Sequence, residues 1–149
     1  MGALEIEWQS RVVKRLHREG AYARKASSTY AVGVLDLDTI IPGLGNVKIE
    51  VKLEKGLKAG WKRKIMYTEK QKDEAANIIK AGGYALGLVI AHYAPQNVRM
   101  VLHRMPDPLE TFHASEAMLN GKGFKWEKSR TDPYFSGQII QAVERLDYE

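Results

Sequence analysis

Hydrophobic positions recur with the period of an α-helix at the start of the chain. Trp8, Val12 and Leu16 stand four residues apart within residues 4–19, and this spacing gathers their side chains on one face of a helix. Gly20 follows at a position where helices commonly end. The pattern predicts an N-terminal helix with one buried stripe.

The pattern then changes to short apolar runs of the kind that form β-strands. We expect a short strand over 21–25 and an antiparallel hairpin over 33–41 and 46–53, because a Pro-Gly-Leu-Gly-Asn turn sequence separates the last two runs. A basic loop is expected over 54–66, and Thr68 is a suitable N-cap for a second helix. The helix is predicted from about 68 to 81, with strands to follow over 84–92 and 97–103.

The order of helix, three strands, helix and two strands predicts an α/β domain in which helices flank a mixed central sheet. A single domain suits a chain of 149 residues. We expect its core within about 4–105 and a C-terminal helical extension over about 106–149. Weaker patterns in that extension suggest a helix over 109–119, a connection over 120–135 and a final helix over 137–146.

Acidic residues interrupt the two runs of the predicted hairpin. Glu50 and Lys52 alternate with Ile49 and Val51, so Glu50 and Lys52 share one face of their strand. Asp36, in the neighbouring run, can bring a second carboxylate close to Glu50. Hard divalent cations such as Mg²⁺ bind oxygen ligands of this kind. The two carboxylates and the lysine therefore predict metal-assisted hydrolysis of a phosphodiester.

A third carboxylate is available on the N-terminal helix. With about 100° of rotation per residue, Glu5 falls near the middle of the apolar stripe, whereas Glu7 falls almost opposite it. An acid on a buried face is costly unless it is paired or binds metal, which favours Glu5 as the third ligand. The alternative is an exposed first-turn glutamate favoured by the helix dipole. Whether Glu5 or Glu7 completes the site stays open.

Composition and charge point to the class of partner. The chain has no cysteine, which excludes disulfides and thiolate zinc sites. It has no apolar run long enough for a membrane span, so a cytoplasmic protein is expected. The net charge of +5 favours a polyanionic partner. Two acids (Glu54, Glu69) and eight basic residues lie between 52 and 72, with Trp61 and Tyr67 among them: Lys52, Lys55, Lys58, Lys62, Arg63, Lys64, Lys70 and Lys72.

Basic residues interleaved with aromatics are typical of a nucleic-acid-binding surface, where charge meets phosphates and rings meet bases. The alternative for this run is a solvated loop and helix face. The four histidines, His17, His92, His103 and His113, are scattered without metal-binding spacing, which favours structural or surface roles. The sequence has no glycine-rich phosphate loop, so use of ATP is not expected.

Taken together, these residues resemble the PD-(D/E)xK nuclease superfamily, whose fold is restriction-endonuclease-like. The closer resemblance is to virus-type replication-repair nuclease (VRR-NUC) domains and archaeal-type Holliday-junction resolvases, over about 5–90. If the resolvases are aligned without a gap at Gly20, their helix glutamate falls on Gln9 rather than Glu5. The matching motifs are Glu5 with Trp8, Val12, Leu16 and Gly20; Arg24 and Ser27; 33–37; 49–52; and 67–71.

The resemblance implies roles for individual residues. Asp36, Glu50, the Val51 carbonyl and Glu5 would hold Mg²⁺, for which Mn²⁺ can substitute. Lys52 would stabilise charge on the attacking hydroxide or the phosphate, and Gln71 would orient water. The residues expected to contact the DNA are Arg24, Lys25, Ser27, Ser28, Lys55, Lys62, Arg63 and Lys64.

The implied activity is that of a structure-specific DNA endonuclease acting in recombination and repair. A homodimeric Holliday-junction resolvase from a phage or a prokaryote is expected first, because paired incisions on a two-fold junction need two linked active sites. One alternative is a VRR-NUC-type nickase or a flap or repair nuclease. The other is a DNA-binding module without catalytic activity.

Overall fold

The computed structural model describes residues 3–26, 34–57, 62–63, 67–93, 97–105, 112–113, 123–125 and 139–144. Its elements are α1 (Ala3–Arg18), β1 (Tyr22–Lys25), β2 (Leu37–Ile41), β3 (Gly45–Leu57), β4 (Lys62–Arg63), α2 (Glu69–Lys80), β5 (Tyr84–Tyr93), β6 (Asn97–Arg104), β7 (Phe112–His113), β8 (Gly123–Lys125) and α4 (Ile139–Glu144). None of the helices in these ranges is long and apolar enough to cross a membrane.

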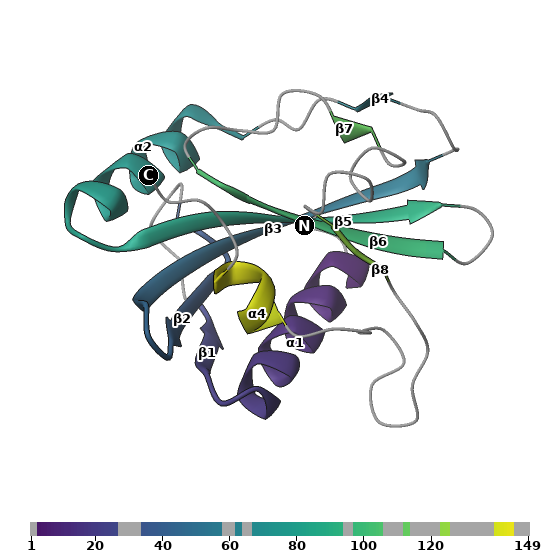
Figure 1. The fold of residues 1–149 in the computed structure, drawn as a ribbon. Coiled ribbons are helices and arrows are strands. Elements are labelled where there is room, and N and C mark those ends of the chain that lie inside the picture. Colours follow the sequence, from purple (N-terminus) through teal and green to yellow (C-terminus); the bar gives the residue numbers. More distant parts are fainter. Residues whose placement is uncertain are drawn as a thin grey trace.

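A six-stranded sheet in the order β1-β2-β3-β5-β6-β8 forms the centre of the molecule (Figure 1). Strands β3 and β5 run parallel, and the other neighbouring pairs run antiparallel. Helices α1 and α4 lie on one side of the sheet and α2 on the other (Figure 1). The predicted mixed sheet flanked by helices is confirmed, as is the hairpin of β2 and β3.

The main hydrophobic core lies between the sheet and α1. Trp8, Val12 and Leu16 are fully buried, as their four-residue spacing predicts, and they belong to one cluster with Ile49 and Val51 of β3. Strand side chains alternate between faces. The burial of Ile49 and Val51 on the α1 side therefore directs Glu50 and Lys52 to the α2 side.

Helix α2 begins after Thr68, the N-cap that its sequence predicts, and Thr68 forms a capping box with Gln71. The Thr68 side chain accepts a hydrogen bond from the Gln71 amide at 3.1 Å, and the Gln71 side chain accepts one from the Thr68 amide at 3.0 Å. This reciprocal pair satisfies backbone donors at the helix start and fixes the Gln71 side chain. Ala75 is fully buried on the inward side of the helix.

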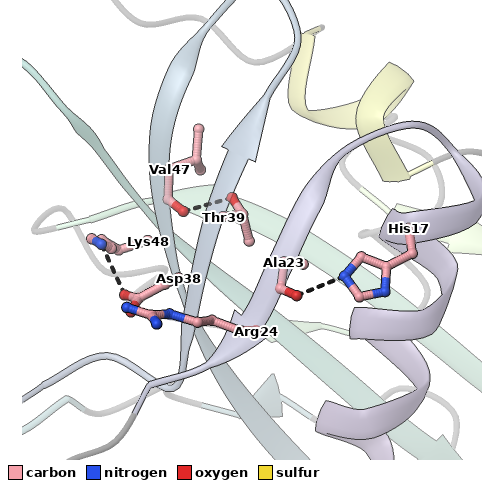
Figure 2. A network of polar contacts seen from close by, with 7 residues as sticks. All are labelled: His17, Ala23, Arg24, Asp38, Thr39, Val47 and Lys48. Carbon is pink, nitrogen blue, oxygen red and sulfur yellow. Dashed lines mark hydrogen bonds and ion pairs between the residues drawn. The ribbon is translucent and has the colours of Figure 1, made fainter.

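Polar ladders tie the first three strands together (Figure 2). Asp38 on β2 pairs with Lys48 on β3 at 2.8 Å and with Arg24 on β1 at 3.5 Å. The buried Thr39 hydroxyl donates to the Val47 carbonyl at 2.6 Å. These contacts span neighbouring strands at matching register positions, so they fix the alignment of the hairpin that carries Asp36 and Glu50.

The C-terminal segment packs back onto the first helix. Ile139 and Val143 of α4 are fully buried in the main core. The Glu19 carboxylate, just after α1, accepts hydrogen bonds from the Ile139 amide at 3.0 Å and the Ile140 amide at 2.8 Å. An anionic acceptor at a helix start satisfies donors that have no partner within the helix.

Two predicted segments differ from the structure. The expected loop over 54–66 contains the end of β3, which runs to Leu57 beside β5, and the short strand β4. Of the expected helix over 109–119, the described part is β7, which pairs with β4. The expected helical extension also supplies β8, which adds to the free edge of β6. Pairing with strands distant in the sequence decides these conformations.

Candidate active site

Asp36 and Glu50 face each other at the open end of the β2–β3 hairpin. Leu37 is opposite Ile49 in the antiparallel register, so Asp36, one residue earlier, lies opposite Glu50. The Asp36 amide donates a hydrogen bond to Glu50 Oε1 at 3.1 Å, and Asp36 Oδ2 accepts one from the Val51 amide at 2.9 Å. Each carboxylate is therefore held by the backbone of the opposite strand.

The Val51 backbone adds an oxygen on the same side. In an antiparallel pair, the N–H and the C=O of one residue bond to the same residue of the opposite strand. Both groups of that residue therefore point in the same direction. The Val51 amide points at Asp36, and its carbonyl therefore lies on the side of Asp36 too. Two carboxylates and a carbonyl are a donor set suited to a hard divalent cation.

The environment of Glu50 disfavours its charged form. Glu50 is 3% exposed. Burial, first, and then a side-chain hydrogen bond with the Asp36 carboxyl and its negative charge raise the pKa of Glu50 from 4.5 to about 8, while the Lys52 ammonium and the Asp36 amide act in the opposite direction. Two adjacent acids in a buried position need a proton or a cation between them.

Gln71 reaches the acidic pair from the first turn of α2. Its Nε2 donates a hydrogen bond to Glu50 Oε2, while its Oε1 is engaged by the Thr68 amide. The capping box thus fixes which end of the amide group faces the carboxylate. The structure brings this predicted residue to the predicted metal site.

A tyrosine and a histidine extend the site across the sheet. Gly87 of β5 is the register partner of Glu50 on β3 and of His103 on β6. Residues opposite each other on neighbouring strands lie on the same face of a sheet, so Glu50 and His103 share the face above Gly87. The Tyr67 hydroxyl lies 2.6 Å from His103 Nε2 above Gly87. The Lys52 ammonium lies 5.2 Å from the centre of the Tyr67 ring. The sequence did not predict the contacts of Tyr67 with His103 and Lys52. A glycine inside an apolar strand, which often marks a close approach, is the signal that points to them.

Glu5 is not grouped with the acidic pair. Among the described residues, no three His, Cys, Asp or Glu side chains lie together as a metal-binding group. Glu5 is half-buried on α1, and α1 packs on the face of the sheet opposite Glu50. Glu7 is exposed, as its position opposite the apolar stripe predicts, and it pairs with Arg11. Gln9, the alternative position on this helix, is 4% exposed.

The predicted DNA-contacting residues are spread over several elements. Arg24 is exposed on β1 and lies opposite Asp38 on the same face of the sheet. Asp38 is two residues from Asp36, so this is also the face of Asp36. Lys25 is exposed and its Nζ donates to the Ile6 carbonyl at 3.4 Å. Lys55 lies in β3, and Lys62 and Arg63 form β4. Ser27, Ser28 and Lys64 lie outside the described residues.

The sheet order, the helices on both faces and the acidic pair at a hairpin end define a restriction-endonuclease-like fold. A solved structure with this fold is that of Hjc from Archaeoglobus fulgidus, a Holliday junction resolvase from an archaeal hyperthermophile. It matches with a TM-score of 0.52 and 14% sequence identity, over 93% of this chain and 98% of that chain. No protein-family model matches the sequence, and no curated protein matches it. At this identity the similarity establishes the fold.

Proposed function

We propose that the protein is a metal-dependent, structure-specific DNA endonuclease that acts on branched DNA as a Holliday-junction resolvase. The observation that carries this proposal is the pairing of Asp36 with Glu50, with Lys52 on the same strand face. The fold shared with a solved resolvase supports the choice of nuclease class. We also propose that residues 1–149 form one nuclease domain, because α4 contributes to the core around α1 and the sheet.

The residues at this position fit a divalent metal ion. Asp36, Glu50 and the Val51 carbonyl would hold Mg²⁺ or Mn²⁺, and the positive charge of such an ion would offset the burial and the negative charge of Asp36 that raise the pKa of Glu50. When bound, such an ion activates water and neutralises charge on the phosphate. Glu5 is kept as a proposed third ligand, although the described residues do not group it with Asp36 and Glu50.

The protein's own groups position and polarise the reactants. Lys52 places its ammonium on the metal-site face, where it stabilises negative charge that develops on the phosphate oxygens. Gln71 holds Glu50 through its amide N–H and keeps the carboxylate aimed at Asp36. Both side chains are supported by regular elements, β3 and the first turn of α2.

The DNA is proposed to pass over the face of the sheet that carries Asp36. Arg24 and Lys48 lie on this face beside the acidic pair, and the other proposed contacts are Lys25, Ser27, Ser28, Lys55, Lys62, Arg63 and Lys64. A four-way junction has two-fold symmetry, so we propose a homodimer whose two sites make paired incisions.

The experiment is a cleavage assay on a synthetic four-way junction, a flap and a linear duplex, each in Mg²⁺, in Mn²⁺ and in EDTA. We expect symmetric, metal-dependent cuts in the junction and none in the duplex. We also expect the protein to have the solution mass of a dimer. Cleavage confined to the flap would support a repair nuclease instead. Binding to the junction without cutting in either metal would contradict an enzyme.

A further inference from the structure

The Lys52 ammonium lies over the face of the Tyr67 ring, and Tyr67 interacts electrostatically with Glu50 of the acidic pair. We infer that Tyr67 is a positioning residue for Lys52, and that His103 anchors the Tyr67 ring from the far end. The inference rests on the proposed nuclease function, because that function gives the Lys52 ammonium its role at the phosphate.

The contact between Lys52 and Tyr67 has the geometry of a cation–π interaction. The ammonium lies 5.2 Å from the ring centre, within the distance of about 6 Å at which the ring face attracts a cation. A lysine carries its charge on a flexible four-carbon stem, so an external contact must select one position. Among the described residues, that contact is the Tyr67 ring and not an ion pair with a carboxylate.

The ring itself is fixed by a chain of hydrogen bonds. His103 Nδ1 lies 2.9 Å from the Arg104 carbonyl, which only accepts, so this nitrogen carries the proton. His103 Nε2 then accepts the Tyr67 hydroxyl at 2.6 Å. Burial and the charge of Glu50 raise the pKa of Tyr67, which keeps its hydroxyl protonated and able to donate.

Gly87 makes room for this arrangement. A Cβ atom at position 87 would overlap both the Tyr67 hydroxyl and the His103 ring. Tyr67 is 5% exposed and His103 is 7% exposed, so neither presents a large surface to DNA. Their burial favours a role in holding Lys52 over a role in binding the substrate.

The position of the ammonium matters because Lys52 interacts electrostatically with Glu50, and Asp36 is hydrogen-bonded to Glu50. An ammonium that paired with Asp36 or Glu50 would occupy the oxygens that a metal ion needs. The Tyr67 ring gives Lys52 a different resting place on the same face. We therefore expect the Lys52 ammonium to face the phosphate, while the carboxylates of Asp36 and Glu50 stay available to a metal ion.

The first test observes Lys52 directly in the metal-free protein. The ε-methylene signals of ¹³C-labelled lysines are recorded by NMR, and the Lys52→Arg variant identifies the signal of Lys52. A methylene above a ring face is shifted upfield. We expect this shift in the wild type, a smaller shift in Tyr67→Phe, which keeps the ring but loses the hydrogen bond to His103, and no shift in Tyr67→Leu, with Tyr22→Leu as an exposed aromatic control. An unshifted wild-type signal would overturn the inference.

The second test separates turnover from substrate binding. At saturating metal, Tyr67→Leu should lower kcat for junction cleavage roughly tenfold, the size expected for one partly desolvated cation–π contact. The KM for DNA should stay unchanged, and Tyr67→Phe, which keeps the ring without its hydrogen bond to His103, should restore part of the turnover. An unchanged kcat, or a rise in KM alone, would overturn a positioning role.

The two tests distinguish this inference from the proposed function. If the wild type cuts no DNA, the nuclease proposal fails, and the NMR result alone decides whether Tyr67 holds Lys52. If Tyr67→Leu does not fold, His103→Leu keeps the ring and removes its anchor. The Lys52 signal should then move toward those of the other lysines, and an unmoved signal would count against the inference.

Discussion

The Asp36 amide donates to Glu50 Oε1 over 3.1 Å, and this bond places the two acids face to face across the end of the hairpin. The Val51 amide returns a second bond, to Asp36 Oδ2, at 2.9 Å. Backbone groups therefore bring together two carboxylates that would otherwise repel each other. The protein bears this electrostatic cost in its metal-free state, and the cost can be measured.

The first prediction concerns the pH dependence of stability in EDTA. Because the pKa of Glu50 rises from 4.5 to about 8 on folding, the folded protein holds a proton that the unfolded chain releases within this range. The stabilisation is fully present below pH 4.5 and is lost as the pH rises through about 8. The free energy of unfolding should fall by up to about 1.4 kcal/mol per pH unit in between.

Urea denaturation across this pH range measures the effect, with Glu50→Gln as the control. The variant cannot release a proton at this position, so the difference between the two proteins isolates the contribution of Glu50. The profile of Glu50→Gln should be flatter. Parallel profiles for the two proteins would show that Glu50 is an ordinary carboxylate.

The second prediction concerns Gln71→Glu. A glutamate preserves the capping box with Thr68 but replaces the N–H that faces Glu50 by a third carboxylate. In EDTA the free energy of unfolding should fall by about 1–3 kcal/mol, and added Mn²⁺ should reverse much of the loss. Thr68→Ala, which removes the cap alone, should cost about 1 kcal/mol with or without metal. If Mn²⁺ stabilised Gln71→Glu and Thr68→Ala equally, Gln71 would not lie at the metal site.

The third prediction concerns the space above Gly87. Gly87→Ala should lower the free energy of unfolding by about 1–3 kcal/mol, because its methyl group overlaps the Tyr67 hydroxyl and the His103 ring. Ala85→Gly, on the same strand and face, tests the opposite change and should cost about 0.5–1 kcal/mol. Thermal and urea unfolding measure both. A Gly87→Ala protein as stable as the wild type would mean that Tyr67 does not occupy this space.

The fourth prediction concerns the attachment of α4. The Glu19 side chain is 5% exposed. It accepts hydrogen bonds from Arg15 and from the first two backbone amides of α4. Glu19→Ala leaves these donors without their acceptor, which should cost about 2–3 kcal/mol and speed proteolysis within 139–144. Glu7→Ala on α1 removes only an exposed ion pair and should cost less than about 1 kcal/mol. Similar losses in both variants would contradict the role of Glu19.

The sequence predicts the elements whose causes are local. The stripe of Trp8, Val12 and Leu16 places α1, and the Thr68 cap places α2, each to within a residue or two. The pairing of Asp36 with Glu50 is also predictable, because a tight turn fixes the register of the hairpin that connects them.

Contacts between distant residues are not predictable in this way. Tyr67 and His103 are 36 residues apart, and they meet only because β5 pairs with both β3 and β6. Glu19 reaches the start of α4 across 120 residues. Periodicity carries no information on such pairs, and the same holds for the extension of β3 along β5 and for the position of Glu5.

We propose that Asp36 and Glu50 form the metal site of a nuclease, and one assay tests this directly. It compares cleavage of a synthetic four-way junction in Mg²⁺ by the wild type, Asp36→Asn and Asp38→Asn, with junction binding measured in parallel. Asp38 is the matched control, because it lies on the same face as Asp36 but forms an ion pair with Lys48. We expect Asp36→Asn to bind the junction without cutting it, and Asp38→Asn still to cut. Normal cleavage by Asp36→Asn would contradict a metal site at Asp36 and Glu50.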